Sequence, residues 1–407
     1  MNKKQFQIFL ALFWTRNIIV LYTRVVLYRL TNSENIAFGF EYALFVLAIL
    51  IAMPFMARKI RLADILLYIV LASFYIFSME KSPFPAAQEY LQNNAFDYLC
   101  TNLPMLFVGT CFVDDDYIKF LKKVSFISIL ANVLCFVVMG TTGMNLGDDN
   151  MGLSYYLLPH VGIMLYFSLA DKKKIDIAVF LLGVFMSIIY GTRGPVLSVG
   201  VTFIAIWLLL NVKKLTAKQY VGIGLGVVLL IVIWQLMPLI GAALLNSGFS
   251  NRVIEMAVSG EFASDFGRDM IRDVVMEQIE RNPAGYGLAY DRLLTDYWGV
   301  SISYSHNIVL ELWISFGVII GSLIFAFLIF HIYRGIKAAP TKDQKGFILV
   351  LLCGSGMLRL FLSGTFLQSP ELYLMIGVCI GEIRQKKTIE KQKKLQLSIK
   401  KVKSVYA

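Results

Sequence analysis

Long apolar runs recur along the whole chain and constrain its fold more than any other feature. Many of these runs reach about 18 residues or more, enough for a helix to cross a hydrocarbon layer roughly 30 Å thick. The apolar residues are continuous and do not alternate in period 2, as they would in a transmembrane barrel. Of 407 residues, 57% are hydrophobic and only 16% are charged. Soluble domains carry roughly 25% charged residues, so we expect an all-α, polytopic integral membrane protein.

Twelve spans are expected, and they form a single membrane domain over residues 1–407. The predicted spans are 6–28, 37–57, 62–80, 98–113, 121–140, 151–170, 175–191, 194–212, 220–241, 306–333, 346–367 and 370–384. The first is interrupted by Thr15-Arg16-Asn17, and the spans 98–113 and 370–384 are short. No small-residue cleavage site follows the first run, so we expect this run to act as a signal anchor.

The net charge of +11 is distributed in a way that indicates topology. Lysines gather at 3–4, 59, 119–123, 172–174, 213–218, 337–345 and 386–403. These positions fall in alternate loops, as the positive-inside rule requires of cytoplasmic loops, and only Lys81 lies in a loop placed outside. We therefore expect no nucleic-acid partner. The basic tail, 385–407, is predicted to be cytoplasmic, where contact with anionic membrane lipid or with a protein partner is an alternative role.

Neither a metal nor a cofactor is expected. The five cysteines lie in or at the ends of apolar segments without metal or redox spacing, so we interpret them as packing residues. The chain has no P-loop, no HExxH and no GxSxG. The Asp114-Asp115-Asp116 run adjoins lysines on the predicted cytoplasmic side and is interpreted as a solvated loop.

The one long polar segment, residues 241–305, is predicted to be a large extracytoplasmic loop. Apolar residues at helical spacing predict an amphipathic helix over Asp265–Arg281. Asn282-Pro283 should end it, because proline disfavours helix in the preceding residue. Ala284-Gly285-Tyr286-Gly287 then predicts a turn. A loop this long is unusual without a function, so we expect it to contribute to the active site.

Arginine replaces lysine at almost every cationic position outside. The outer arginines are Arg193, Arg252, Arg268, Arg272, Arg281 and Arg292. The planar guanidinium holds phosphate oxygens in pairs, which suits a diphosphate at the membrane surface. For Arg272 and Arg281 we favour the alternative of pairing with acidic residues of the same helix. Arg193 stands between two glycines at a membrane edge, where the alternative is simple snorkelling.

His306 is the histidine predicted at the outer mouth of a span. An imidazole there can accept a proton from a sugar hydroxyl or orient it. The alternative is a histidine in the interface at the start of a helix. Ser305, Asn307 and Glu311 surround it, and Asn307 and Glu311 share a helix face at spacing i,i+4. These polar neighbours favour a functional site.

Arg359 is predicted mid-span, where an ionisable group is a candidate for function. The equal alternative is an ion pair with a carboxylate such as Glu41, Glu311 or Glu371. His160 and His331 are interpreted as structural residues, packed or hydrogen-bonded.

Together these features resemble the O-antigen polymerase/ligase family over roughly residues 150–335. The resemblance rests on Gly191-Thr192-Arg193-Gly194 before a span, Arg268 opening a helix, Asn282-Pro283-Ala284-Gly285-Tyr286-Gly287, Ser305-His306-Asn307-Ile308-Val309-Leu310-Glu311 and Phe316-Gly317-Val318-Ile319-Ile320-Gly321. The first third of the chain matches only as a bundle of spans.

The resemblance implies a bacterial plasma-membrane (inner-membrane) glycosyltransferase with a GT-C-like helical fold and its active site on the extracytoplasmic face. Its donor would be an oligosaccharide on undecaprenyl diphosphate, and transfer would proceed with inversion and without a metal. Arg193 and Arg268 would hold the diphosphate, and His306 would activate the acceptor hydroxyl. The residues expected to bind substrate are Arg272, Arg292, Asn307, Glu311, Arg359 and Tyr304. A flippase and a chain-length regulator would be protein partners.

Several functions remain open at this stage. A polymerase and a ligase differ in the acceptor, a lipid-linked repeat unit or a lipid A core, and we favour the polymerase. A flippase for lipid-linked oligosaccharides should show repeated halves with broken helices or charges near the midplane. The sequence shows no such repeat, and its polar residues concentrate at one face. A membrane acyltransferase using His306 would need an acidic neighbour, which Asn307 does not supply.

Overall fold

The protein is helical throughout the part of the chain that its structure, a computed structural model, describes. That part comprises residues 4–16, 19, 34–112, 114–141, 150–190, 193–211, 268–295, 305–405 and a few isolated positions between 238 and 259. Residues 4–16 are helical. The α-helices that follow are α2 (Glu34–Met56), α3 (Leu62–Lys81), α4 (Pro85–Asn93), α5 (Met105–Cys111), α6 (Asp115–Thr141), α7 (Asn150–Asp171), α8 (Lys174–Ile189), α9 (Arg193–Asn211), α12 (Arg268–Arg281), α13 (Ile308–Phe316), α14 (Val318–Ala338), α15 (Lys342–Val350), α16 (Arg359–Leu362) and α17 (Pro370–Val405). Two π-helices, η1 (Asp97–Asn102) and η5 (Leu351–Ser355), and two 3-10 helices, η4 (Tyr290–Thr295) and η6 (Phe366–Gln368), connect them.

Six helical stretches in the described parts are long and apolar enough to cross a membrane. They are Leu62–Lys81, Asp115–Val137, Gly152–Asp171, Gly194–Asn211, Val318–Ala338 and Lys342–Leu362, and each falls on a predicted span. The span predicted at 220–241 lies almost wholly outside the described residues. Twelve crossings therefore stay a prediction, while the class of multi-pass helical membrane protein is confirmed.

Two predicted spans differ from the structure. The span 98–113 is interrupted at Leu103-Pro104 between η1 and α5, because proline cannot donate the backbone hydrogen bond that continues a helix. The span 306–333 was wrong at its start: the helix begins at Ile308 and breaks at Gly317 into α13 and α14. Gly317 has φ +83° and ψ 161°, a conformation open almost only to glycine, and it separates the two helices.

The centre of the bundle is α7, and α3 lies on its periphery. Of the apolar window in α7, 78% is buried, whereas in α3 the share is 11%. The exposed side chains of α3 include Leu66, Val70 and Phe77, so this helix presents an apolar surface suited to lipid. Close packing of α5 against α17 depends on small residues. A Cβ on Gly109 would lie 2.6 Å from Val378 N.

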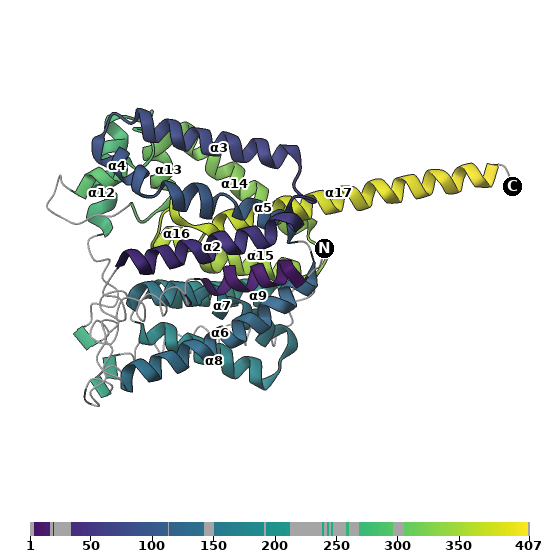
Figure 1. The fold of residues 1–407 in the computed structure, drawn as a ribbon, viewed down its shortest axis with the longest axis horizontal. Helices are drawn as coiled ribbons and strands as arrows, with labels where there is room; N and C mark the ends of the chain where they lie inside the picture. The colour runs from purple at the N-terminus through teal and green to yellow at the C-terminus, as the bar shows by residue number, and fades with distance from the viewer. Residues whose placement is uncertain are drawn as a thin grey trace.

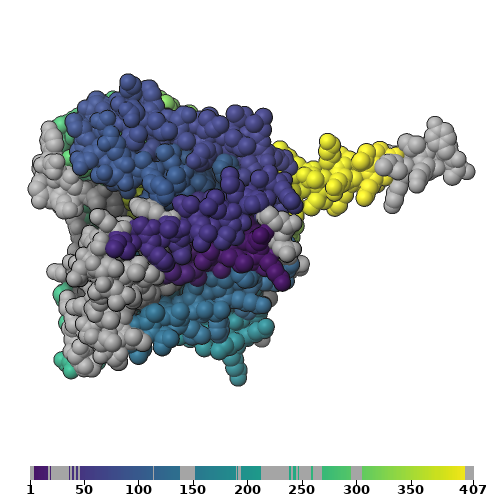
Figure 2. All heavy atoms as spheres, in the orientation of Figure 1, coloured from purple at the N-terminus to yellow at the C-terminus, as the bar shows by residue number. Residues whose placement is uncertain are grey.

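The two ends of the bundle carry different elements. The helices α4 and α12 and the start of α13 gather at one end, and the basic C-terminal half of α17 projects from the other (Figure 1). The projecting part stands clear of the body (Figure 2), and residues 386–398 are exposed. The predicted tail therefore begins within the last helix, which is continuous through Val405.

Candidate functional site

The amphipathic helix predicted in the large loop is present as α12. Its apolar face, which includes Ile271 and Val275, packs with Leu310 and Ile314 of α13 in a small separate core. The helix is described from Arg268, three residues after the predicted start. The core fixes the returning end of the loop on the bundle.

The turn after α12 docks on the break between α13 and α14. The Tyr286 N–H donates to Ile314 O (2.8 Å), and the Gly287 N–H donates to Ser315 O (3.1 Å). In return, the Val318 N–H donates to Pro283 O (3.0 Å). The turn thereby satisfies carbonyls at the end of α13 and an amide at the start of α14, groups that a helix end leaves unpaired.

The two arginines on the exposed face of α12 form the ion pairs that the sequence favoured. Arg272 Nη1 lies 2.7 Å from Asp269 Oδ1, and Arg281 Nη2 lies 2.5 Å from Glu277 Oε1. Both arginine side chains are 56% exposed. Pairs of this kind hold the guanidinium on its own helix, so a substrate would have to displace the acid to use Arg272.

His306 lies in a strained connection directly before α13. Its φ is +53°, in the left-handed region that non-glycine residues rarely adopt. Hydrogen bonds hold the residues on both sides of His306. The Ser305 N–H donates to Asp291 Oδ2 (2.9 Å), and Asn307 caps α13 by accepting from the Val309 N–H (2.9 Å). Asn307 therefore acts as a helix cap, and its role toward a substrate stays a prediction.

The environment keeps His306 neutral at physiological pH. Burial and, to a smaller extent, the positive charges of Arg268 and Arg292 lower the pKa of His306 to about 4, while the charge of Asp291 opposes this shift. Arg268, at the exposed start of α12, and Arg292, on η4, are thus close enough to act electrostatically on one imidazole. The structure brings these three predicted site residues together.

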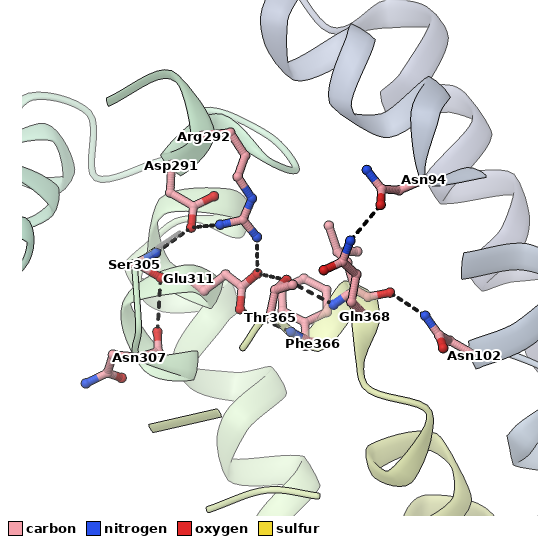
Figure 3. Close-up of polar contacts among 11 residues, drawn as sticks. Asn94, Asn102, Asp291, Arg292, Ser305, Asn307, Glu311, Thr365, Phe366 and Gln368 are labelled. Carbon is pink, nitrogen blue, oxygen red and sulfur yellow. Dashed lines mark hydrogen bonds and ion pairs between the residues drawn. The ribbon is translucent and has the colours of Figure 1, made fainter. Parts of the chain in front are cut away.

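Arg292 is buried in a polar network instead of facing solvent. Its side chain is 7% exposed, with Nη1 3.1 Å from Asp291 Oδ2 and Nη2 3.5 Å from Glu311 Oε1. Glu311, which is 3% exposed, also accepts from Thr365 Oγ1 and from the Phe366 N–H (3.2 Å). Figure 3 shows this network, which joins η4, α13 and the segment before α17.

The helix α4 contributes a side of the site that sequence reasoning missed. The Arg292 guanidinium lies over the Tyr90 ring at 4.9 Å, a cation–π contact. Phe84, at the cap of α4, packs edge-on against Tyr290 at 4.7 Å between ring centroids. The proline at the start of α4 was the available signal for a helix here. Asp291 and Thr365 were missed because their partners are far away in sequence.

Arg359 lies beside the start of α9. Its guanidinium lies over the Tyr155 ring at 4.8 Å, and its Nε has no hydrogen-bond partner among the described residues. Tyr155 in turn lies against Gly194, where a Cβ would lie 3.1 Å from the Tyr155 ring carbon Cζ. Arg193 opens α9, but its side chain, like all of Tyr304 and Arg252, lies outside the described residues.

The other two histidines have the structural settings expected for them. His160 is fully buried in α7, with Nδ1 3.3 Å from Ser125 Oγ and its ring edge-on to Trp14. His331 stacks on Phe327 within α14. These contacts confirm packed, hydrogen-bonded or stacked roles for both.

The fold and the site define a multi-pass helical membrane protein with arginines and a neutral histidine gathered at one end of the bundle. Comparison with known families identifies the segment that carries most of this site. Residues 178–326 match the family model described as O-antigen ligase, which confirms the resemblance to the O-antigen polymerase/ligase family. No curated protein and no solved structure matches the chain significantly.

The matched segment runs from α8 into α14 and includes Arg193, Arg268, Arg292, His306 and Glu311. Members of this family are glycosyltransferase-like enzymes of O-antigen assembly, so the match supports a role in surface-polysaccharide biosynthesis. The first third of the chain, Arg359 and Thr365 lie outside the matched segment.

Proposed function

We propose that this protein is a surface-polysaccharide polymerase. It transfers a growing glycan from undecaprenyl diphosphate to a sugar hydroxyl of an incoming lipid-linked repeat unit, on the outer face of the bacterial plasma membrane. The observation that supports this most is the convergence of Arg268 and Arg292 on His306. The exposed guanidinium of Arg268 beside a neutral base suits a reaction in which a diphosphate leaves and an alcohol loses a proton. Arg292, which is paired with Asp291 and Glu311, adds to the positive potential that keeps His306 unprotonated.

In the proposed reaction, the acceptor hydroxyl oxygen attacks the anomeric carbon as the bond from that carbon to the diphosphate oxygen breaks. The configuration inverts, and the lipid diphosphate leaves with the bonding electron pair. His306 accepts the hydroxyl proton because it is unprotonated at physiological pH. Arg268 stabilises the negative charge that develops on the leaving diphosphate, and this role needs no metal.

The bound donor also strengthens His306 as a base. A diphosphate placed near Arg268 offsets the positive charge that lowers the pKa of His306. The pKa of the imidazole then rises toward the operating pH, where a general base is most effective. The free site keeps His306 neutral, and donor binding increases its affinity for the acceptor proton.

The test uses purified protein in liposomes with a defined undecaprenyl-diphosphate repeat unit, with product length followed on a gel. Wild-type protein should produce a ladder of lengthening glycans, and Arg193→Ala, Arg268→Ala and His306→Ala should produce none while remaining folded. Transfer of a single glycan only after addition of a lipid A core would identify a ligase, the activity named by the family description. Movement of the lipid-linked sugar across the bilayer without lengthening would contradict the enzyme and favour a flippase.

A further inference from the structure

Three buried ionisable side chains connect the candidate base to the rest of the bundle. Asp291, Arg292 and Glu311 form a chain of ion pairs, which we call the brace. We infer that the brace is a positioning device: it holds His306 in its catalytic placement without contacting substrate. This inference rests on the proposed function for its effect on catalysis, and it assigns to Arg292 and Glu311 a role different from substrate binding.

One end of the brace holds the residue before His306. Asp291 Oδ2 accepts both the Ser305 N–H (2.9 Å) and Arg292 Nη1 (3.1 Å), and the Asp291 residue is 1% exposed. Ser305 is itself 4% exposed. The backbone on the N-terminal side of His306 is therefore fixed by a charge-assisted hydrogen bond, which is stronger than one between neutral groups.

The other end is anchored on two further parts of the chain. Glu311 accepts from Thr365 Oγ1 and the Phe366 N–H. The same short segment is fastened to the first third of the protein, because Leu367 O accepts from Asn102 Nδ2 (2.7 Å) and Gln368 Nε2 donates to Asn94 Oδ1 (2.6 Å). Figure 3 shows the bonds from Ser305 through Asp291 and Arg292 to Glu311, and those from the short segment to Asn94 and Asn102. The brace thus ties the large loop to elements that it does not adjoin in sequence.

The brace restrains a backbone conformation of His306 that is otherwise disfavoured. A non-glycine residue in the left-handed region persists only where its surroundings over-determine it. Asn307 supplies the restraint on one side through its helix cap, and the Asp291 bond to Ser305 supplies it on the other. Without the brace, the backbone at His306 would be free to move to the negative φ values that non-glycine residues prefer.

A purely stabilising role explains the brace less well. Buried ion pairs contribute little stability compared with apolar side chains of similar size, because desolvation offsets their attraction. Arg292 is also poorly placed to bind a substrate anion. Its charge already contacts Asp291, Glu311 and the Tyr90 ring, whereas an arginine exposed to solvent would have its charge available. A device that fixes geometry accounts for both the burial and the contacts of Arg292 with Asp291, Glu311 and Tyr90.

The experiment compares Glu311→Gln, Arg292→Gln and the double variant in the full-length protein. In Glu311→Gln, exchange of the Ser305 amide, followed in a peptide that begins several residues before Ser305, should be about tenfold faster. Its kcat should fall about tenfold to hundredfold, since misplacement by about 1 Å has effects of that size, with KM within about twofold of wild type. Arg292→Gln leaves both carboxylates without their cation, so it should be the least stable of the three. The double variant removes one of these carboxylates, so it should regain part of the thermal stability that Arg292→Gln loses, without regaining slow exchange or kcat.

Two further variants separate the possible outcomes. Thr365→Val leaves all charges in place and removes one bond to Glu311, so it remains informative if the other variants do not fold, and it should show a smaller effect of the same kind. Asp64→Asn is the matched control, because Asp64, in the first turn of α3, forms a comparable ion pair with Arg384 of α17 (2.5 Å). Asp64→Asn should lower the thermal stability, but amide exchange at Ser305 and kcat should stay as in wild type.

Recovery of kcat in the double variant would overturn the inference and leave the brace as a stabilising pair. A rise in KM with unchanged kcat would also overturn it, since that result assigns Arg292 or Glu311 to substrate binding. Unchanged exchange at Ser305 in every brace variant would overturn it independently of activity. If wild-type protein transfers no glycan, the proposed function fails, and the exchange measurement still decides whether the brace holds His306.

Discussion

Gly285 of the large loop and Gly317 at the helix break lie in direct backbone contact, each with positive φ (+91° and +83°). A Cβ on Gly317 would lie 2.6 Å from Ala284 O, and one on Gly285 would lie 2.9 Å from Phe316 C. Only glycine fits at either position. This contact holds the large loop against the bundle and so sets the distance between α12 and the start of α13.

Replacing Gly317 by alanine should therefore separate the large loop from the end of α13. The variant combines a disfavoured φ with a clash against backbone, so we expect the free energy of unfolding to fall by about 1–3 kcal/mol and glycan transfer to be lost. Thermal unfolding in detergent measures the first effect. Gly200→Ala is the control: a Cβ there meets nothing within 4 Å, and because alanine favours the helix by up to about 1 kcal/mol, stability should not fall. Equal effects of the two substitutions would contradict the proposed role of the contact.

The pKa of His306 should depend on the arginines beside it. Burial and the charges of Arg268 and Arg292 lower it to about 4. Arg268→Ala should raise the pKa of His306, and adding pyrophosphate to wild type should raise it as well. Histidine ring signals in NMR spectra, assigned by comparison with His306→Gln, report both changes. A pKa that responds to neither would place Arg268 and the diphosphate away from His306.

The same pKa determines how His306 affects stability as pH falls. Its pKa is lowered in the folded protein, to about 4 from the ordinary 6.5, so the unfolded chain binds a proton that the folded protein does not. The free energy of unfolding should therefore decrease as pH falls from about 6.5 toward 4, and this contribution should level off below that. His306→Gln should show a smaller decrease over the same window. An identical pH profile for both proteins would rule out this linkage.

Two arginines of α12 should differ sharply in their importance for transfer. Arg268 acts electrostatically on His306, whereas Arg272 is paired with Asp269 on the exposed face. We expect Arg268→Ala to lower kcat/KM by about a hundredfold or more, as loss of a charge at a developing anion does. Arg272→Ala should stay within about threefold of wild type, because exposed pairs contribute little. A large loss in Arg272→Ala would restore its predicted role in substrate binding.

Arg359 should act through its planar guanidinium as well as through its charge. It stacks on Tyr155, which borders the start of α9 beside Arg193. Lysine keeps the charge but cannot stack or bind oxygens in pairs, so Arg359→Lys should raise KM for the lipid-linked donor by about tenfold. Arg334→Lys is the control, since Arg334 also lies over a ring, that of Phe330, within α14. Equal KM values for Arg359→Lys and wild type would remove Arg359 from the donor site.

The sequence by itself determined the class of protein and the local parts of the site. Lengths of apolar runs and helical spacing are local properties, so they predicted the membrane helices and the buried face of α12, including Ile271 and Val275. The excess of arginine outside also directed attention to Arg268 and Arg292. Preference for ion pairs within a helix correctly assigned Arg272 and Arg281.

Only the tertiary structure decided which of these residues meet. The break at Gly317 follows from a turn that reaches it from another part of the chain, and helix periodicity contains no trace of that contact. Glu311 is hydrogen-bonded to Thr365, 54 positions away in the sequence, and Asn102 is hydrogen-bonded to Leu367, 265 positions away. Such pairs depend on how helices pack against one another, because packing brings distant residues into one buried space where a charge must find a partner. For that reason Arg292, expected to face a substrate, is instead enclosed between Asp291 and Glu311.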